Sequence, residues 1–252
     1  MDLQLSGTRV LVTGGTRGIG RAVVEAFLAE GAHVAFCARN AEEISATQEA
    51  LQARGTVSGS TVDVGDEKAL TAWVERSADS FGGLDVIVAN VSALAIPDTE
   101  ENWQASLNVD LMHTVRLVRA AMPHLERSKG ASVVAISSVS GRESDFASGP
   151  YGTAKTAIIG YIHGLAMQLA SKGIRANTVS PGNTYFEGGV WNGIETGDPD
   201  LFRAAMDLNP SGHMGTPEEV AAAVVFLASP LARRISGTNL VVDGALTRGI
   251  QL

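Results

Sequence analysis

Cysteine and positive charge are both scarce in this chain. One cysteine, Cys37, occurs among the 252 residues, which excludes an intramolecular disulfide and any metal site made of several thiolates. The net charge is −8 and lysine and arginine form no cluster, so the field of the whole protein disfavours nucleic acid and anionic membrane surfaces. We therefore expect neither of these as a partner.

Long apolar runs and targeting signals are missing as well. The opening residues, MDLQLSGTRVLV, hold no basic segment followed by an apolar signal region, and no uncharged span of membrane length occurs later. We therefore expect a cytoplasmic protein. The histidines show no metal-ligand spacing, so we interpret all of them as structural or surface residues and expect no metal site; they are His33, His113, His124, His163 and His213.

Short apolar runs alternate with segments of helical length and composition. Strands are expected at 9–13, 33–38, 56–62, 84–89, 131–137 and 174–179, with a last strand ending at 242–244. Helices are expected between the first two strands, at 41–54, 66–81, 99–127 and 151–172, and before the last strand. Pro123 is expected to kink or end the helix at 99–127. This alternation predicts an α/β fold: one domain over residues 1–252, a Rossmann-type doubly wound seven-stranded parallel sheet with helices on both faces.

Glycines recur between the first strand and the first helix. Gly14, Gly18 and Gly20 follow Thr13 and permit a tight turn and a close backbone approach to an anion. A helix that begins there offers free amides and the positive end of its dipole to that anion. The succession of strand, glycines and helix therefore predicts a phosphate-binding loop.

The end of the second strand carries arginine where a dinucleotide-binding fold can carry an acid. An acid about 20 residues after the glycines would bind a ribose 2′-hydroxyl, whereas arginine suits a 2′-phosphate. Here Ala38 and Arg39 occupy that place, and Arg17 in the glycine loop supplies a second guanidinium. These residues favour NADP(H) as the cofactor.

A serine, a tyrosine and a lysine occur where the strand at 131–137 gives way to the next helix. Tyr151 and Lys155 are four residues apart, so they lie on one face of its first turn. A phenol, with a pKa of about 10, is a poor acid or base at neutral pH unless a nearby cation stabilises the phenolate. Lys155 can supply that cation, and Ser138 can hydrogen-bond the oxygen that exchanges a proton with Tyr151.

These pieces, in order and spacing, resemble the short-chain dehydrogenase/reductase family over essentially the whole chain, in its single-domain form of about 250 residues. The matching pieces are Thr13-Gly-x-x-x-Gly-x-Gly20, Asp63, Asn90, Asn108, Ser138, Tyr151-x-x-x-Lys155 and Pro181-Gly182. Within the family, the chain resembles the carbonyl and 3-oxoacyl reductases that prefer NADP(H). The resemblance implies hydride transfer between a nicotinamide cofactor and a carbonyl or alcohol carbon.

The resemblance also implies a role for each catalytic residue. Tyr151 would be the general acid for ketone reduction and the base in the reverse direction. Ser138 would hold the substrate oxygen, and Lys155 would bind the nicotinamide ribose and lower the proton affinity of the tyrosine. Asn108 would hold a water that links the lysine to a proton relay.

The cofactor contacts are predicted from the glycine loop, from the two arginines and from the family resemblance. The resemblance matches Asp63 and Val64 to an adenine-contacting pair. The expected cofactor-binding residues are Gly14, Thr16, Arg17, Gly18, Ile19, Gly20, Arg39, Asn40, Asp63, Val64, Asn90, Tyr151, Lys155, Pro181, Gly182 and Thr184.

Two stretches depart from the family pattern. Where the family commonly has Asn-Asn-Ala-Gly, this chain has Ala89-Asn-Val-Ser92, so the packing around that strand end must differ. After Pro181-Gly182 the family has an apolar residue and then, two positions later, a threonine that meets the carboxamide. Those places hold Thr184 and Phe186 here, and Thr184 is expected to reach the nicotinamide.

The substrate site is expected on loops after the strand ends, where open α/β sheets bind ligands. Its candidate residues are Leu94, Ile96, Arg142, Phe146, Tyr185, Phe186 and Trp191. A substrate loop is expected at about 182–216, and its glycine-rich part, 182–199, is either a lid or an ordinary surface loop. A small molecule is the expected partner, with a simple ketone, a polyketide-like acyl chain and a sugar-derived carbonyl all open.

The helix at 151–172 is apolar nearly all the way round. Such a helix must be buried on more than one side, which predicts a homo-oligomer, by resemblance a tetramer. For the function we favour an NADP-dependent ketone reductase. The alternatives are an NAD-dependent alcohol dehydrogenase that works in the oxidative direction and a non-catalytic dinucleotide-binding protein.

Overall fold

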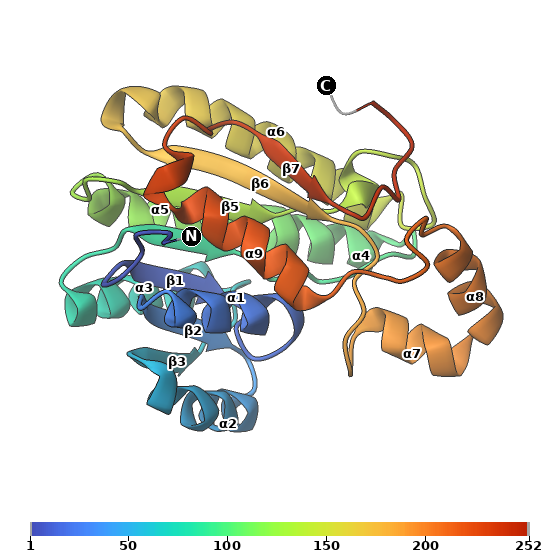
Figure 1. The fold of residues 1–252 in the computed structure, drawn as a ribbon, viewed down its shortest axis with the longest axis horizontal. Helices are drawn as coiled ribbons and strands as arrows, with labels where there is room; N and C mark the ends of the chain where they lie inside the picture. The colour runs from blue at the N-terminus through green and yellow to red at the C-terminus, as the bar shows by residue number, and fades with distance from the viewer. Residues whose placement is uncertain (1, 251–252) are drawn as a thin grey trace.

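A computed structural model describes residues 2–250 of the chain. It contains one seven-stranded parallel sheet in the order β3-β2-β1-β4-β5-β6-β7 (Figure 1). The strands are β1 (Arg9–Thr13), β2 (His33–Ala38), β3 (Val57–Thr61), β4 (Val86–Ala89), β5 (Ser132–Ile136), β6 (Arg175–Pro181) and β7 (Asn239–Val242). The predicted single-domain, doubly wound parallel sheet is confirmed.

Helices cover both faces of this sheet. The longer ones are α1 (Gly18–Ala29), α2 (Ala41–Leu51), α3 (Glu67–Phe81), α5 (His113–Leu125), α6 (Pro150–Leu169) and α9 (Pro217–Ala228). The shorter ones are α4 (Glu100–Ala105), α7 (Val190–Gly197), α8 (Pro199–Asp207) and the 3-10 turns Gln52–Arg54, Val139–Gly141, Ala170–Lys172 and Pro230–Ala232. Among the residues described, no helix is long and apolar enough to cross a membrane.

The five central strands are buried on both faces because their alternate residues enter opposite cores. In β1, Leu11 packs with α3, α5 and α6, whereas Val10 and Val12 pack with α1 and α9. A strand with two buried faces needs a continuous apolar run, which is the pattern that the sequence shows. Cys37 is part of the first core, and burial raises the pKa of its thiol to about 12.

The strand order reverses direction at β1, which pairs with β2 on one side and with β4 on the other. The connections after β1 and β4 therefore leave in opposite directions and open a crevice at the carboxyl ends of the strands. In open α/β sheets this switch point is where ligands bind.

The helical region predicted over 99–127 is present, but its middle is not α-helical. The chain forms α4, then a π-helical segment (Ser106–Met112), then α5, and the amide of His113 bonds to the carbonyl of Asn108 five residues back. One extra residue in a helical turn does not alter the apolar pattern enough to be read from the sequence. Pro123 does not stop the helix either, because α5 continues past it to Leu125.

The predicted substrate loop at 182–216 is also more ordered than expected. It contains α7 and α8, which lie beside the end of the sheet at the lower right of Figure 1. Their apolar residues form a small separate cluster around Trp191, Ala205 and Met214. Pro199 at the first helical position and Asp198, whose side chain accepts from the amide of Leu201, define where α8 begins.

Candidate active site

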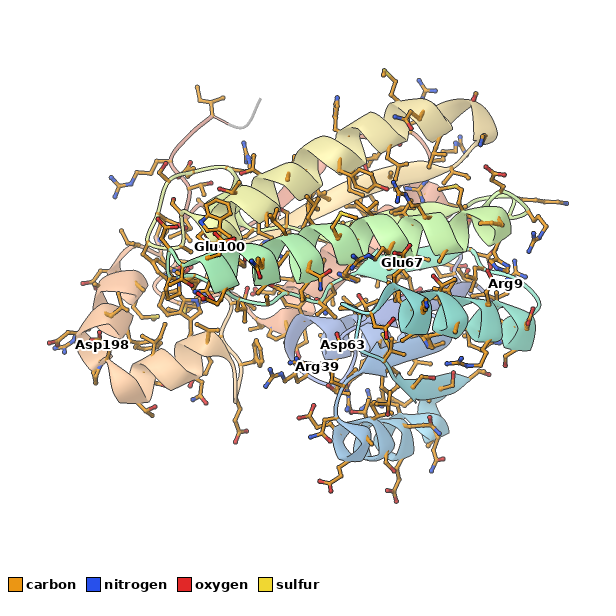
Figure 2. All side chains as sticks on the ribbon, turned by 180° about the vertical axis from the view of Figure 1, so that it is seen from behind. Arg9, Arg39, Asp63, Glu67, Glu100 and Asp198 are labelled. Carbon is orange, nitrogen blue, oxygen red and sulfur yellow. The ribbon has the colours of Figure 1, made fainter. Side chains whose placement is uncertain are left out.

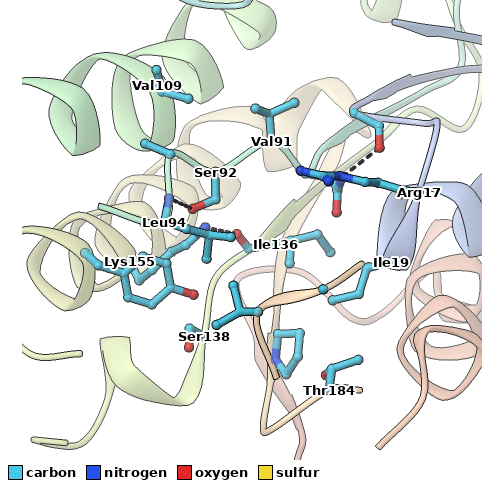
Figure 3. Close-up of a pocket in the computed structure, with 18 of the residues that line it drawn as sticks. Arg17, Ile19, Val91, Ser92, Leu94, Val109, Ile136, Ser138, Lys155 and Thr184 are labelled. Carbon is cyan, nitrogen blue, oxygen red and sulfur yellow. Dashed lines mark hydrogen bonds between the residues drawn. The ribbon is translucent and has the colours of Figure 1, made fainter. Parts of the chain in front are cut away.

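A cavity of about 670 Å³ runs along the carboxyl ends of the strands (Figure 3). It is lined by all but two of the predicted catalytic and cofactor-binding residues: Gly14, Thr16, Arg17, Ile19, Gly20, Arg39, Asn40, Asp63, Val64, Asn90, Ser138, Tyr151, Lys155, Pro181, Gly182 and Thr184. Gly18 and Asn108 are the two that do not line it. Residues up to 170 positions apart in sequence are thus brought to one crevice by the parallel sheet.

The glycine loop presents the first turn of α1 to this cavity. Arg17 is the N-cap of α1, and its side chain makes no capping hydrogen bond, so the first amides of the helix have no side-chain acceptor. Gly20 must be glycine, since a Cβ atom there would lie 2.0 Å from the carbonyl oxygen of Gly14. The loop therefore has the close backbone packing and the free amides that suit a pyrophosphate group.

Gly18 is covered by the ring of Phe186. A Cβ atom at Gly18 would lie 2.5 Å from Cζ of that ring, and the φ of +53° also favours glycine. Phe186 occupies the place where the family pattern has threonine, so this departure gives the glycine loop an aromatic neighbour.

The two arginines at the other end of the cavity are exposed. Arg17 and Arg39 line the cavity, and neither forms an ion pair with another residue of the described range 2–250. Figure 2 labels Arg39 and Asp63 beside each other, and both line the cavity. An acid, Glu43, lines this end as well. Its Oε2 accepts from Thr16 Oγ1 at 2.9 Å.

Asn40 and Asn90 are engaged by the protein itself. The side chain of Asn40 caps α2 by accepting from the amides of Glu42 and Glu43. Asn90 Nδ2 donates to the carbonyls of Thr13 and Gly14 at 3.0 and 3.3 Å, which ties the end of β4 to the glycine loop. Asn90 thus shapes the loop, even though the first asparagine of the family pattern is Ala89 here.

Ser138, Tyr151 and Lys155 meet at the centre of the cavity. Ser138 follows β5 and its Oγ accepts from the amide of Ser140, which leaves the hydroxyl hydrogen free to be donated. Lys155 Nζ lies 5.5 Å from the centroid of the Tyr151 ring and donates to the carbonyl of Ile136 at 3.2 Å. Figure 3 shows Ser138 and Lys155 on one wall of the pocket, with Arg17 and Ile19 opposite.

The structure contradicts the expectation for Asn108. Its side chain is exposed, accepts from Arg116 at 2.7 Å and donates to the carbonyl of Gly65, so it does not face Lys155. Asp110 does, with Oδ1 3.1 Å from Lys155 Nζ. The helical pattern contained a signal for this, because Asp110 lies in register with buried Thr114, Leu117 and Ala121.

The charges beside Tyr151 are deeply buried. Burial opposes the charge of Lys155, but the carboxylate of Asp110 and the neighbouring Tyr151 outweigh it and raise the pKa of Lys155. Burial also lowers the pKa of His113 to about 4. The neutral ring donates from Nδ1 to the carbonyl of Val109, because a carbonyl can only accept, and Nε2 accepts from Thr13.

The wall beyond Ser138 is apolar and aromatic. Of the predicted substrate residues, Leu94, Ile96, Phe146, Phe186 and Trp191 line the cavity. The rings of Phe146 and Trp191 meet edge to face with centroids 5.7 Å apart. The cavity lining also includes residues that the sequence did not predict as substrate contacts, among them Val91, Ser92, Ala93, Val109, Val139, Ala147 and Val190.

Two predicted substrate residues lie elsewhere. Arg142 is exposed outside the cavity lining, and Tyr185 faces α7 and α8, where its ring packs on Phe202 and its hydroxyl donates to Glu195 at 2.5 Å. Aromatic residues in one loop can face opposite sides, and only the helices formed by that loop decide which side each one takes.

The fold and the cavity define a dinucleotide-binding oxidoreductase: a glycine loop lies at the switch point of a parallel sheet, and a serine, a tyrosine and a lysine share its crevice. The chain belongs to the short-chain dehydrogenase/reductase family. Residues 14–247 match the family described as enoyl-(acyl carrier protein) reductase.

Relatives cover nearly the full length of the chain. The chain is 41% identical to an isoepoxydon dehydrogenase of Penicillium expansum, over 98% of this chain and 97% of the relative. It is similar to a crystal structure of a Burkholderia cenocepacia short-chain dehydrogenase in complex with NADP, with 32% identity, a TM-score of 0.88 and coverage of 96% and 99%. L-Sorbose reductase from Gluconobacter frateurii, complexed with NADPH and L-sorbose, gives 26% identity, a TM-score of 0.91 and coverage of 99% and 100%.

Proposed function

We propose that this protein is an NADPH-dependent reductase that converts a ketone to a secondary alcohol and can run the reverse reaction. The observation that carries the proposal is the convergence of Ser138, Tyr151 and Lys155 on one cavity that also contains the glycine loop and two arginines without an ion-pair partner in residues 2–250. A proton donor, a hydride carrier and a carbonyl can meet in such a cavity.

Residues at both ends of the cavity support NADPH as the cofactor. At one end, the uncapped amides of α1 suit the pyrophosphate, and the guanidiniums of Arg17 and Arg39 suit a 2′-phosphate. At the other end, Lys155 and Thr184 would hold the nicotinamide riboside. The solved relatives from Burkholderia cenocepacia and Gluconobacter frateurii, which were crystallised with NADP and NADPH, support the same choice.

The residues of this chain would supply the proton and the orientation. When bound, the reduced nicotinamide supplies the hydride. The Ser138 hydroxyl donates to the substrate oxygen and stabilises the charge that develops there, and Tyr151 transfers its proton to the same oxygen. Lys155, a buried cation 5.5 Å from the Tyr151 ring centroid, stabilises the phenolate that remains.

The apolar wall favours a compact substrate with a hydrophobic face. Leu94, Ile96, Phe146 and Trp191 are apolar, and the carboxylate of Asp145 beside Phe146 already accepts from Ser140 Oγ. A ring or a branched carbon skeleton next to the carbonyl therefore suits this wall better than a long polar chain. The likeness to an isoepoxydon dehydrogenase supports a small oxygenated ketone or alcohol rather than an acyl chain.

One observation favours the runner-up, an NAD-dependent alcohol dehydrogenase. Glu43 lines the adenosine end of the cavity, and a carboxylate there can bind a ribose 2′-hydroxyl and repel a 2′-phosphate. In the structure this carboxylate already accepts from Thr16, and the guanidiniums of Arg17 and Arg39 have no ion-pair partner within residues 2–250. The balance of charge therefore favours NADPH.

We also propose that the protein works as a cytoplasmic homotetramer. Met167 on α6 is 80% exposed, and Ile159 and Tyr161 on the same helix are only partly buried in one copy of the chain. A second copy packed on α6 would cover them. Sedimentation should give an assembly of four chains, and a stable monomer at micromolar concentration would contradict this proposal.

The test of function is oxidation of NADPH by the purified protein with a panel of cyclic and branched ketones, together with the reverse reaction on the matching alcohols. We expect turnover with NADPH above that with NADH, and a loss of about 10²–10⁴-fold in kcat/KM for Tyr151→Phe. Tighter NADH than NADPH binding would favour the runner-up. Tight NADPH binding without turnover in either direction across the panel would favour a non-catalytic binding protein.

A further inference from the structure

Asp110 is the one acid among residues 2–250 that is fully buried. Its exposed fraction is 0%, and it lies in the π-helical segment Ser106–Met112, next to the cavity but not in its lining. A carboxylate in such a place is costly unless it is paired, so its partners should explain why it is there.

Three contacts fix Asp110 between elements that build the site. Its Oδ1 lies 3.1 Å from Lys155 Nζ on α6, as an ion pair rather than a well-aligned hydrogen bond. Its Oδ2 accepts from the amide of Ala93 at 3.0 Å, in the cavity wall after β4. Its own carbonyl accepts from Thr114 Oγ1 at 2.9 Å, which holds the π-helical turn.

Lys155 needs this partner because it is only 2% exposed. Apart from Asp110, residues 2–250 offer its ammonium group one acceptor, the carbonyl of Ile136. The hydrogen bond to Ile136 uses one of the three N–H groups, and even with the ion pair to Asp110 at least one N–H group is left for a ligand in the cavity.

The other ionisable groups around the pair do not replace Asp110. Tyr151 lies on the cavity side of Lys155 and His113 lies behind it, neutral because burial lowers its pKa to about 4. Arg116, a turn further along α5, is another cation and donates to the carbonyl of Gly65 and to Asn108. No second carboxylate of the described chain forms an ion pair with Lys155.

We propose that Asp110 is a positioning residue that keeps Lys155 charged and aimed between Tyr151 and the cofactor ribose. The inference rests on the proposed function and assigns to an acid the link to Lys155 that the family resemblance assigned to Asn108. Without Asp110, the burial of Lys155 has no compensating charge, and the lysine loses its proton at a lower pH.

The test uses Asp110→Asn, which keeps the shape and removes the charge, with Asn108→Ala as the matched control two residues away. We expect the alkaline limb of kcat/KM for ketone reduction to move down by about 1–3 pH units in Asp110→Asn. The NADPH dissociation constant should rise at least about tenfold near pH 9, since one pH unit of displaced protonation is a tenfold change. Both profiles of Asn108→Ala should superimpose on those of the wild type.

A stability measurement keeps the proposal testable if Asp110→Asn folds poorly. The apparent Tm of Asp110→Asn should be below that of the wild type, and Lys155→Met added to it should recover part of the loss, because it removes the unpaired cation. The proposal is overturned if the two pH profiles of Asp110→Asn match the wild type, or if Lys155→Met gives no recovery. A wild type that binds NADPH but reduces no ketone contradicts the proposed function alone, because the binding profile and the Tm comparison still test the ion pair.

Discussion

The two ends of the cavity use charge in opposite ways. At the adenosine end, Arg17 and Arg39 are exposed and unpaired within residues 2–250, whereas Lys155 and Asp110 at the other end are buried against each other. An exposed cation keeps its water and costs little stability, so it can be exchanged as cofactor preference changes. A buried cation loses its water and requires a counter-charge, so its partner is part of the site.

The difference in environment sets the size of each effect. Two unit charges about 4 Å apart interact by about 1 kcal/mol in water and by about 4 kcal/mol where the effective dielectric constant is about 20. Salt screens the attraction between an exposed arginine and a cofactor phosphate over about 8–10 Å. It weakens the buried ion pair of Lys155 and Asp110 far less. Changes at the buried end should therefore be large and insensitive to salt, and changes at the exposed end smaller and salt-dependent.

The largest expected effect is that of Lys155→Met. This change removes the cation beside Tyr151 and leaves Asp110 buried without its partner, so we expect kcat/KM for ketone reduction to fall about 10²–10⁴-fold. The loss should be the same at 50 mM and 500 mM salt. Steady-state kinetics at the two salt concentrations check this, and an activity within threefold of the wild type would contradict it.

The buried end should also control stability in acid. The folded-state pKa of His113 is about 4, below the value of about 6.5 expected when the chain is unfolded. The unfolded chain therefore binds this proton first, and the free energy of unfolding should fall by about 3 kcal/mol as pH decreases from about 6.5 to about 4. Urea unfolding across this range measures the fall, which should be smaller in His113→Gln; equal slopes for the two proteins would show that other groups cause it.

A smaller effect is expected at the exposed end. Arg39→Ala should raise the KM for NADPH by about tenfold at low salt, leave the KM for NADH nearly unchanged, and lose most of this difference at 500 mM salt. Arg142→Ala is the matched control, because Arg142 is an exposed arginine outside the cavity lining. A fall in kcat with an unchanged KM for NADPH would show that Arg39 acts on another step.

The smallest effect is expected from the apolar wall. Trp191→Ala removes the edge-to-face contact with Phe146 and should raise the KM for the best ketone about 2–10-fold, with little change in the KM for NADPH. Tyr185→Phe serves as the control, since Tyr185 lies on the other side of the same loop. A change of equal size in both variants would indicate a general disturbance of α7 and α8 rather than a contact with the substrate.

Much of the site could be predicted because it depends on short-range pattern. Gly20 has to follow Gly14 at that spacing for the turn to close, and Tyr151 and Lys155 share a face because they are four residues apart on a helix. Each of these relations lies within one turn or one helix. The parallel strands then bring these residues to one edge of the sheet, because the carboxyl ends of all the strands lie there.

Relations across elements were predicted less well. The sequence placed Arg142 and Tyr185 at the substrate wall, but side chains on a loop point where the loop's own packing turns them. The loop at 182–216 folds into α7 and α8 around Trp191, and this packing turns Trp191 towards Phe146 and Tyr185 towards Phe202.

The sequence by itself determined the parallel sheet, the glycine loop and the serine, tyrosine and lysine, because apolar periodicity and local spacing specify them directly. Only the tertiary structure decided which neighbour meets Lys155. Asn108 and Asp110 are two residues apart on a helix, so they face different sides, and the π-helical turn and the packing of α6 direct Asp110 inward. A carboxylate, not an amide, is therefore the buried partner of the lysine. The spacing of Asp110 with Thr114 and Leu117 indicates a buried face, but only the packing of α6 shows that this face meets Lys155.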